Sequence, residues 1–351
     1  MERRSVLITG GAGFIGTNIA RRYLAEDQPV HILDNLSRAG VEQNVAELRQ
    51  CYPGRVEFTR ADVRDRNAVE KAVRGSRFVY HLAAQVAVTT SLEDPVHDLG
   101  TNLVGTLHVL EAIRNSPEPP GLLFTSTNKV YGRLGAITLR EKSTRHEPAD
   151  SALARRGADE RQPLEFLSPY GCSKGSADQY VLEYARSYGL QAVVFRMSCI
   201  YGPYQLGSED QGWVAHFLRQ GLKGEPITIY GDGKQVRDLL FVEDLVDVMR
   251  LVQKNISLVC GEAFNVGGGP ENSSSLVELI NRIRLLTGNP IEVQRGPERL
   301  ADQRWFVADT AKIRNRVSWS PKTNISEGLR RLQSWYAERP SLYEQPAVQV
   351  A

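Results

Sequence analysis

The sequence predicts an α/β protein in which a doubly wound parallel sheet is joined to a smaller, mixed C-terminal domain. Through the first half of the chain, short apolar runs alternate with longer amphipathic stretches, as parallel strands alternate with crossover helices. A glycine cluster follows the first apolar run, and an aspartate ends the second. The length of 351 residues is enough for about two domains.

The expected strands are short and rich in β-branched or aromatic residues. The first covers Val6 to Thr9 and the second runs from Pro29 to Leu33, with a helix from about Thr17 to Ala25 between them. Four further strands are expected, separated by segments of helix length. They lie at residues 56–58, 78–82, 122–125 and 192–196.

Composition excludes several classes of protein. The 43 Lys and Arg against 41 Asp and Glu give a formal charge of +2, which argues against a surface for nucleic acid or an anionic membrane. No apolar run approaches the ~18 residues of a membrane span. The four cysteines form no C-x-x-C pair and the six histidines have no ligand spacing, so we assign no metal. We expect a soluble, cytoplasmic protein.

The glycines Gly10, Gly13 and Gly16 lie three residues apart between the first strand and the first helix. They allow a tight turn, a close approach to a pyrophosphate and close packing of helix on strand, which predicts a Rossmann-like dinucleotide site. Asp34 lies 18 residues after Gly16, where its carboxylate can accept from ribose hydroxyls and would repel a 2′-phosphate. NAD is therefore favoured over NADP, although Arg38 nearby weakens this preference. A structural turn with a surface aspartate is the alternative.

Tyr170 and Lys174 are four residues apart in a segment that opens as a helix at Ser168. Positions i and i+4 share a helix face, so both side chains can reach one ligand. The charge of Lys174 is expected to lower the pKa of Tyr170, making it a base for a substrate hydroxyl. Thr127, after the fifth strand, adds a hydroxyl that shares this proton. A core tyrosine with a solvated lysine is the alternative.

Two stretches define the expected domains. Residues 133–168 are long and polar, and a solvated loop and a lid over a ligand site are equally good interpretations. After about Tyr201 the alternation loosens. We therefore expect an NAD-binding domain over residues 1–200 with a segment returning near 235–253, a substrate domain over 201–340, and a tail over 341–351.

These motifs together resemble the extended short-chain dehydrogenase/reductase superfamily of NAD-dependent epimerases and dehydratases. The segments that carry the resemblance are Thr9-Gly-Gly-Ala-Gly-Phe-Ile-Gly16, Asp34, Asp62-Val63, Leu82-Ala83-Ala84, Tyr170-x-x-x-Lys174, Gly231 to Asp238 and Asp302-Gln-Arg304. The resemblance implies tightly held NAD in the N-terminal domain and a nucleoside-diphosphate-sugar in the C-terminal one. The implied cofactor contacts are Gly10, Gly13, Phe14, Ile15, Gly16, Asp34, Asn35, Arg38, Asp62, Val63, Leu82, Ala83, Ala84, Gln85, Asn102, Thr125, Tyr170 and Lys174.

The resemblance also implies a catalytic set and a substrate site. Thr127, Tyr170 and Lys174 form the catalytic set. Arg237 and Arg304 would clamp the diphosphate, with a surface ion pair as the alternative for either. Cys199 replaces the usual Asn of the superfamily's Arg-x-x-Asn-x-Tyr-Gly motif. The implied substrate contacts are Thr127, Lys129, Cys199, Gln211, Trp213, Tyr230, Arg237 and Arg304.

Three segments, at residues 126–132, 168–180 and 210–214, are similar to CDP-paratose 2-epimerases, also called CDP-tyvelose epimerases. This similarity implies inversion at C2 of a CDP-linked deoxyhexose through a transient 2-keto sugar. A UDP-sugar 4-epimerase is the nearest alternative, and a non-catalytic NAD-sensing scaffold is a remote one. A 4,6-dehydratase would be expected to have a carboxylate where this chain has Asn128. The superfamily's common four-helix-bundle homodimer is implied as well.

Overall fold

The structure, a computed structural model, describes residues 5–339, so the expected tail at 341–351 lies outside the described residues. The chain divides into two compact units that alternate along the sequence. Unit 1 comprises Met1–Val130, Ser168–Arg196 and Val246–Phe264. Unit 2 comprises Tyr131–Leu167, Met197–Leu245 and Asn265–Ala351.

These units differ from the domain limits expected from the sequence. Residues 131–167 belong to unit 2, because their hairpin and helix make their hydrogen bonds to other parts of that unit. The segment that returns to unit 1 is 246–264 rather than 235–253, since it packs beside the first helix and adds a strand to the sheet.

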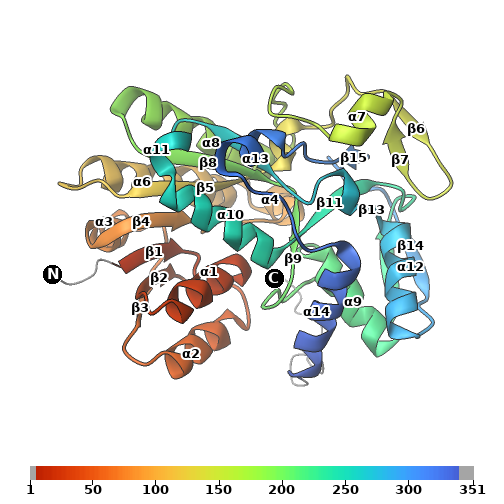
Figure 1. Ribbon diagram of the computed structural model, residues 1–351, viewed down its shortest axis with the longest axis horizontal. Helices are drawn as coiled ribbons and strands as arrows, with labels where there is room; N and C mark the ends of the chain where they lie inside the picture. Colours follow the sequence, from red (N-terminus) through yellow and green to blue (C-terminus); the bar gives the residue numbers. More distant parts are fainter. Residues whose placement is uncertain (1–4, 340–351) are drawn as a thin grey trace. The chain divides into compact units, whose positions relative to one another are not determined.

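Unit 1 is built on a seven-stranded sheet with the order β12-β8-β5-β4-β1-β2-β3. Figure 1 labels the six strands from β8 to β3. The pairs β1–β2, β2–β3, β1–β4 and β4–β5 are parallel, as the alternation of strands and helices predicts. All six expected strands are present, and β12 is a seventh that the loosened pattern after residue 201 did not predict. The strands are β1 (Ser5–Thr9), β2 (Val30–Asp34), β3 (Val56–Arg60), β4 (Ser76–His81), β5 (Gly121–Thr127), β8 (Ala192–Met197) and β12 (Ala263–Val266).

Helices cover both faces of this sheet. Neighbouring residues of a strand point to opposite faces, and Val79 and Tyr80 of β4 do so here. Val79 lies in the apolar core that the sheet forms with α3 (Arg66–Arg74), α6 (Gly105–Arg114) and α8 (Ser168–Tyr188). On the other face, the Tyr80 hydroxyl lies 3.0 Å from that of Tyr23 in α1 (Phe14–Ala25) and donates to the carbonyl of Met249 in α10 (Val242–Lys254).

A buried ion pair fixes α8 on the sheet. The guanidinium of Arg196, in β8, donates two hydrogen bonds of 2.9 Å to the carboxylate of Asp178, in α8. Both side chains are buried, at 6% and 0% exposure, so each charge requires the other. The helix that carries the Tyr-x-x-x-Lys motif is therefore held in place behind that motif.

Unit 2 contains a smaller sheet and three longer helices. Strand β11 (Val236–Phe241) is its centre, pairing with β13 (Ser273–Ser275), β15 (Trp305–Phe306) and β9 (Cys199–Tyr201). A separate parallel pair is formed by β10 (Ile227–Tyr230) and β14 (Val293–Gly296). The helices are α9 (Trp213–Lys223), α12 (Leu276–Thr287) and α14 (Ile325–Ala337).

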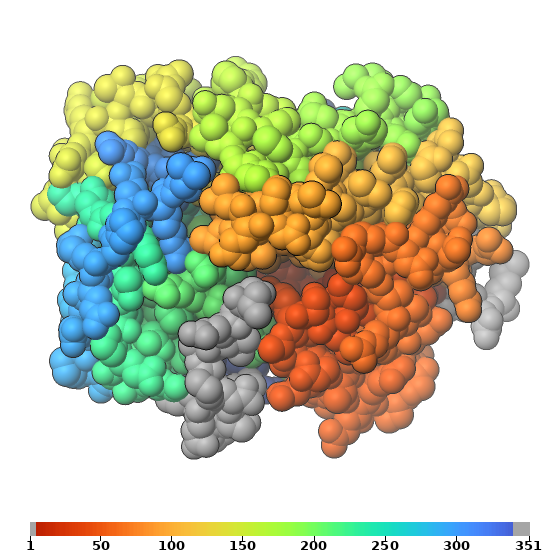
Figure 2. Space-filling model, turned by 180° about the vertical axis from the view of Figure 1, so that it is seen from behind, coloured from red at the N-terminus to blue at the C-terminus, as the bar shows by residue number. Residues whose placement is uncertain are grey.

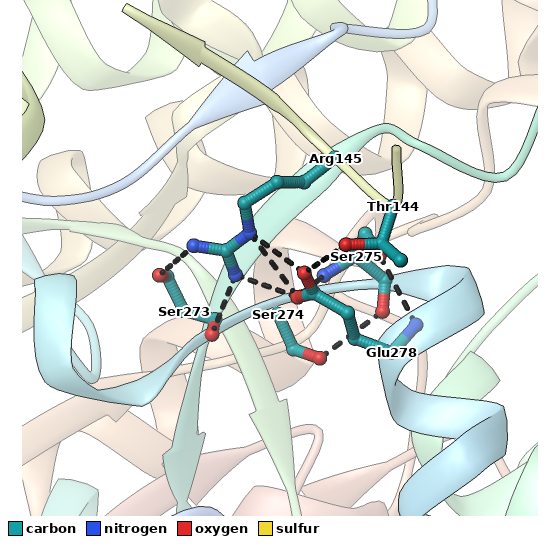
Figure 3. Close-up of polar contacts among 6 residues, drawn as sticks. All are labelled: Thr144, Arg145, Ser273, Ser274, Ser275 and Glu278. Atoms are coloured by element: carbon teal, nitrogen blue, oxygen red, sulfur yellow. Dashed lines mark hydrogen bonds and ion pairs between the residues drawn. The ribbon is translucent and has the colours of Figure 1, made fainter. Parts of the chain in front are cut away.

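The polar stretch at 133–168 forms an ordered part of unit 2. It contains an antiparallel hairpin of β6 (Leu139–Glu141) and β7 (His146–Pro148), followed by α7 (Ser151–Arg156). At the hairpin turn, Arg145 donates to both carboxylate oxygens of Glu278, at 2.9 and 2.7 Å (Figure 3). Glu278 also closes the capping box of α12 with Ser275. The stretch is thus anchored to a helix end and is not a free solvated loop.

The glycine loop has a testable steric requirement. Gly10 has φ +68°, and a Cβ there would lie 2.7 Å from the backbone nitrogen of Ala83. Gly54 has φ +73°, but a Cβ there would have nothing within 4 Å. We expect Gly10→Ala to lower the free energy of unfolding by about 2–4 kcal/mol and Gly54→Ala by only about 1 kcal/mol. Urea unfolding at matched cofactor content measures both; equal losses would contradict the close approach.

Candidate active site

The loop between β1 and α1 is shaped for the backbone of a close ligand. A Cβ at Gly16 would lie 2.5 Å from the Cα of Gly11, so the helix can approach the loop only with glycine there. Gly13 is the N-cap residue of α1 and provides no side-chain cap. The first N–H groups of α1 are therefore available to phosphate oxygens, which the positive end of the helix attracts.

Asp34 ends β2 beside this loop. Its carboxylate accepts hydrogen bonds from the backbone nitrogens of Ala12, at 3.0 Å, and Leu36, at 2.8 Å. Burial raises the pKa of Asp34, while these two bonds and the charge of Arg38 partly oppose the increase. The carboxylate thus lies at the glycine loop, as a ligand of ribose hydroxyls must.

The end of β2 is joined to the segment that follows β3. Asn35 donates to the carboxylate of Asp62 at 2.8 Å, and Arg64 holds the pKa of Asp62 well below its usual range. Val63 is buried, and a Cβ at Gly105 would lie 2.8 Å from its side chain. These contacts place the predicted Asn35, Asp62 and Val63 in one cluster next to the loop.

The predicted residues after β4 and at the end of β5 also lie beside β1. Leu82 donates from its backbone nitrogen to the carbonyl of Thr9 at 3.1 Å, and Ala83 donates to the Thr9 hydroxyl at 3.3 Å. The Thr125 hydroxyl donates to the carbonyl of His81 at 3.1 Å. The carboxyl ends of β1, β4 and β5 thus form one edge, where parallel sheets bind their ligands.

These residues fit NAD. The loop excludes side chains where a pyrophosphate would approach, the N-terminus of α1 lacks a side-chain cap, and Asp34 is in reach of the loop. The buried Gln85 Oε1 and Ser126 Oγ have no hydrogen-bond partner, so each can serve a ligand atom. All the cofactor residues expected from the sequence belong to unit 1.

The three expected catalytic residues meet in unit 1. Tyr170 and Lys174 lie one turn apart on α8 and are both buried. A hydrogen bond joins the side chains of Thr127, at the end of β5, and Tyr170. The backbone nitrogen of Lys129 donates to the Thr127 hydroxyl at 3.1 Å. A phenol, an ammonium and a hydroxyl are therefore grouped at the edge that carries the glycine loop.

The protonation of this group differs from the sequence-based expectation. The Lys174 ammonium donates to the carbonyl of Thr125 at 2.5 Å and lies 4.2 Å from the centre of the Phe124 ring. Burial lowers the pKa of Lys174 to about 7. Burial also raises the pKa of Tyr170 to about 12, against the opposing hydrogen bond from Thr127. The expected lowering of the Tyr170 pKa is thus wrong here, because burial outweighs the other influences.

The expected substrate residues of unit 2 fall into separate groups. Tyr230 and Arg304 line one cavity together with Gly231, Asp232, Gln235, Asp302 and Gln303 of the segments that carry the resemblance. His146 and Glu298 also line it, and the sequence did not predict them. Trp213 donates from its indole nitrogen to Cys199 Sγ at 3.5 Å.

Two further residues of this set have local roles. Arg237 is buried and ion-paired with Asp302, with 2.8 Å between Nη2 and Oδ1. Its alternative interpretation as an ion-pair member therefore holds, although the pair is not on the surface. Gln211 donates from its backbone nitrogen to the Ser208 hydroxyl at 3.3 Å and so closes a turn before α9.

Residues 5–339 contain neither a metal-ligand cluster nor a membrane-spanning helix. Their His, Cys, Asp and Glu side chains form no group of three or more that could hold a metal ion. Within the same residues, every helix is too short or too polar to cross a membrane.

Comparison with known proteins identifies the family. Residues 6–267 match the NAD dependent epimerase/dehydratase family. The chain belongs to this family. The CDP-paratose 2-epimerase of Salmonella typhi is 41% identical over 339 residues, covering 94% of this chain and 98% of the relative. The family, the NAD cofactor and the expectation of a nucleotide-sugar epimerase are thereby confirmed.

Solved structures of the family confirm the Rossmann-like fold. A UDP-glucose 4-epimerase from Thermus thermophilus, in complex with NAD, is 34% identical with a TM-score of 0.79, covering 95% of this chain and 99% of that one. A dTDP-glucose 4,6-dehydratase from Streptomyces venezuelae with NAD bound is 28% identical with a TM-score of 0.81, covering 97% and 99%.

The role of Asp34 gives a binding prediction. We expect Asp34→Ala to weaken NAD binding about tenfold, because the ribose hydroxyls lose a charged acceptor. NADP should be weakened less, since the repulsion of its 2′-phosphate is removed as well. Asp34→Asn, which keeps the shape but not the charge, should shift the preference in the same direction. Fluorescence titration measures both cofactors, and unchanged affinities in both variants would refute the assignment.

Proposed function

We propose that the protein inverts C2 of a CDP-linked deoxyhexose, of the CDP-paratose or CDP-tyvelose type, as an NAD-dependent epimerase acting through a transient 2-keto sugar. The observation that carries the chemistry is the grouping of Thr127, Tyr170 and Lys174 at the edge with the glycine loop. The Salmonella typhi relative supports the choice of sugar and carbon.

Each of the three side chains has a defined task. When bound, NAD supplies an acceptor, and later a donor, for the hydride of the carbon that is inverted. Tyr170 takes the proton of the sugar hydroxyl and later returns it, a task that requires the phenolate and therefore a fall of the Tyr170 pKa from about 12 when the site is filled. Thr127 hydrogen-bonds the same oxygen, because its hydroxyl is already joined to Tyr170. Lys174, one turn away, supplies the positive charge that a buried phenolate requires.

The cavity of unit 2 supports a cytidine nucleotide. The carboxylates of Asp232, Glu298 and Asp302 line it. The exocyclic amine of cytosine donates hydrogen bonds that carboxylates accept, whereas uracil presents a carbonyl oxygen at that position. Asp302 is paired with Arg237, and Asp232 is bonded to His146. On this proposal the Glu298 carboxylate is therefore the group that would repel that oxygen and favour CDP over UDP. On this proposal, Tyr230 and Arg304 contact the nucleotide from the same cavity.

The direct test is turnover of CDP-, UDP-, GDP- and dTDP-sugars by the purified protein in heavy water without added cofactor, followed by proton NMR. Inversion at C2 of a CDP-sugar, with no deuterium at that carbon, is the expected result. Inversion at C4 of a UDP-sugar would replace the proposal with the 4-epimerase alternative. No turnover, with NAD bound to the protein, would refute an epimerase of these sugars.

Removal of one hydroxyl tests the proposed base. We expect Tyr170→Phe to lower kcat by at least about 100-fold, because no other group in the proposal takes the substrate proton. NAD content should be unchanged. Tyr180→Phe is the matched control, since Tyr180 lies on the same helix but is 46% exposed. Equal kcat values for the two variants would remove Tyr170 from the mechanism.

We also propose a homodimer formed by one face of unit 1. Exposed apolar side chains gather on α4 (Val88–Glu93), α5 (Pro95–Leu99), the adjoining π-helical turn η1 (Gly100–Val104) and α8. Figure 2 shows this face, with α4 and α5 in light orange beside α8 in green. Such a patch favours a protein partner. Its members are Leu92, Val96, Leu99, Val104, Tyr180 and Tyr188.

A charge in this face should separate the subunits. Val96 is 78% exposed, and Val96→Glu would bury a carboxylate in the proposed interface. We expect it to shift sedimentation from dimer to monomer. Leu285→Glu, at an 87% exposed position of α12, should leave the dimer intact. A dimer that survives Val96→Glu would place the interface elsewhere.

The cytoplasmic location stays a prediction.

A further inference from the structure

A buried carboxylate behind the catalytic helix has no task in the mechanism above. Asp98, on α5, is 0% exposed. The Ser173 hydroxyl, on α8, donates to its Oδ2, and the side-chain amide of Asn102 donates to its Oδ1 at 3.0 Å. Burying a carboxylate is unfavourable unless it is fully hydrogen-bonded, and both oxygens are. Ser173 lies between Tyr170 and Lys174 in sequence, so this bond holds the turn that carries both.

Asn102 extends the contact toward the cofactor edge. Its side-chain nitrogen donates to the backbone carbonyl of Gln85 at 3.1 Å, and its side-chain oxygen accepts from the backbone nitrogen of Gln85 at 2.9 Å. It lies in the π-helical turn η1, a wider turn that is frequent at functional sites. The turn lets Asn102 reach Asp98, Ser173 and Gln85 together.

A directed chain of hydrogen bonds then leads to the glycine loop. The Thr106 hydroxyl donates its one hydrogen to the backbone carbonyl of Asn102, at 2.6 Å. Its oxygen must therefore be the acceptor in the 3.0 Å bond with His81 Nε2. His81 Nδ1 is therefore the acceptor of the Thr9 hydroxyl, at 2.7 Å, and Thr9 accepts from the Ala83 nitrogen. Burial lowers the pKa of His81 to about 3, which keeps it neutral in this chain.

The charge of Asp98 also acts on the catalytic ammonium. The charges of Asp98 and Asp178 both raise the pKa of Lys174 against the effect of burial. Asp178 is ion-paired with Arg196, whereas Asp98 is bonded to the neutral side chains of Ser173 and Asn102. Burial raises the pKa of Asp98, and the bond from Ser173 and the charge of Lys174 oppose this increase. The other titratable groups on this element and those packed around it are His97, Glu93, Asp94, His81 and Tyr170.

We propose that Asp98 is a positioning residue of the active site: through Ser173 it fixes the turn of α8 that bears Tyr170 and Lys174, and its carboxylate places a negative charge behind that turn. This inference rests on the proposed function, since it assigns Lys174 a charge used in catalysis. Asp98 acts through Lys174 and Ser173 and does not touch the reacting atoms.

Two substitutions separate charge from positioning. Asp98→Asn keeps the shape and removes the charge, so the pKa of Lys174 should fall and the alkaline limb of the kcat profile should move to lower pH by about one unit. The ¹³Cε titration of Lys174 in lysine-labelled holoenzyme should move equally. Ser173→Ala keeps the charge and removes the bond to α8, so kcat should fall about fivefold with the limb in place.

Controls distinguish the possible failures. Glu93→Gln removes a carboxylate from the exposed surface of the neighbouring α4 and should move neither the limb nor the Lys174 resonance. An active unsubstituted protein whose limb and Lys174 midpoint are unchanged in Asp98→Asn would overturn the inference. Inactivity of the unsubstituted protein toward every sugar would instead overturn the proposed function. If Asp98→Asn does not fold, an unchanged kcat in Ser173→Ala overturns the positioning role.

Discussion

The arrangement of the active site depends on one buried ammonium. Lys174 is 3% exposed, and an ammonium shielded from water requires protein acceptors and negative charge. The carbonyl of Thr125 accepts from it at 2.5 Å, and the Phe124 ring lies beneath it. The carboxylates of Asp98 and Asp178 oppose the loss of its proton. These partners come from β5, α5 and α8. The contacts that stabilise the Lys174 charge therefore also hold α8 against the sheet.

The residues proposed to bind the cofactor lie at the same edge of the sheet for a geometric reason. Parallel strands end at one edge, so Thr9, His81 and Thr127, which close β1, β4 and β5, lie near each other. The glycine loop adds its own condition, since Cβ atoms at Gly10 and Gly16 would collide with neighbouring backbone. On the proposed function, cofactor binding and proton transfer therefore share one edge, and the buried polar groups between them are linked by hydrogen bonds.

Unit 2 brings a second set of polar side chains together by different means. The hairpin within residues 131–167 is held by Arg145, whose guanidinium donates to both carboxylate oxygens of Glu278 (Figure 3). Glu278 also caps α12. This anchor fixes the strand that begins with His146, which lines the cavity with Tyr230 and Arg304. A stretch that appears in the sequence only as polar and long thus supplies part of the lining of this cavity.

Residues close along the chain were enough to predict the parallel α/β fold, the glycine loop with Asp34, and the pairing of Tyr170 with Lys174, because each of these features is local. The sequence did not reveal β12, whose four residues form a strand only by joining the sheet. Nor did it reveal the contact of Asp98 with Ser173, the chain of hydrogen bonds through His81, or the raised pKa of Tyr170. Those features follow from burial and from partners distant in sequence, which only the tertiary structure brings together.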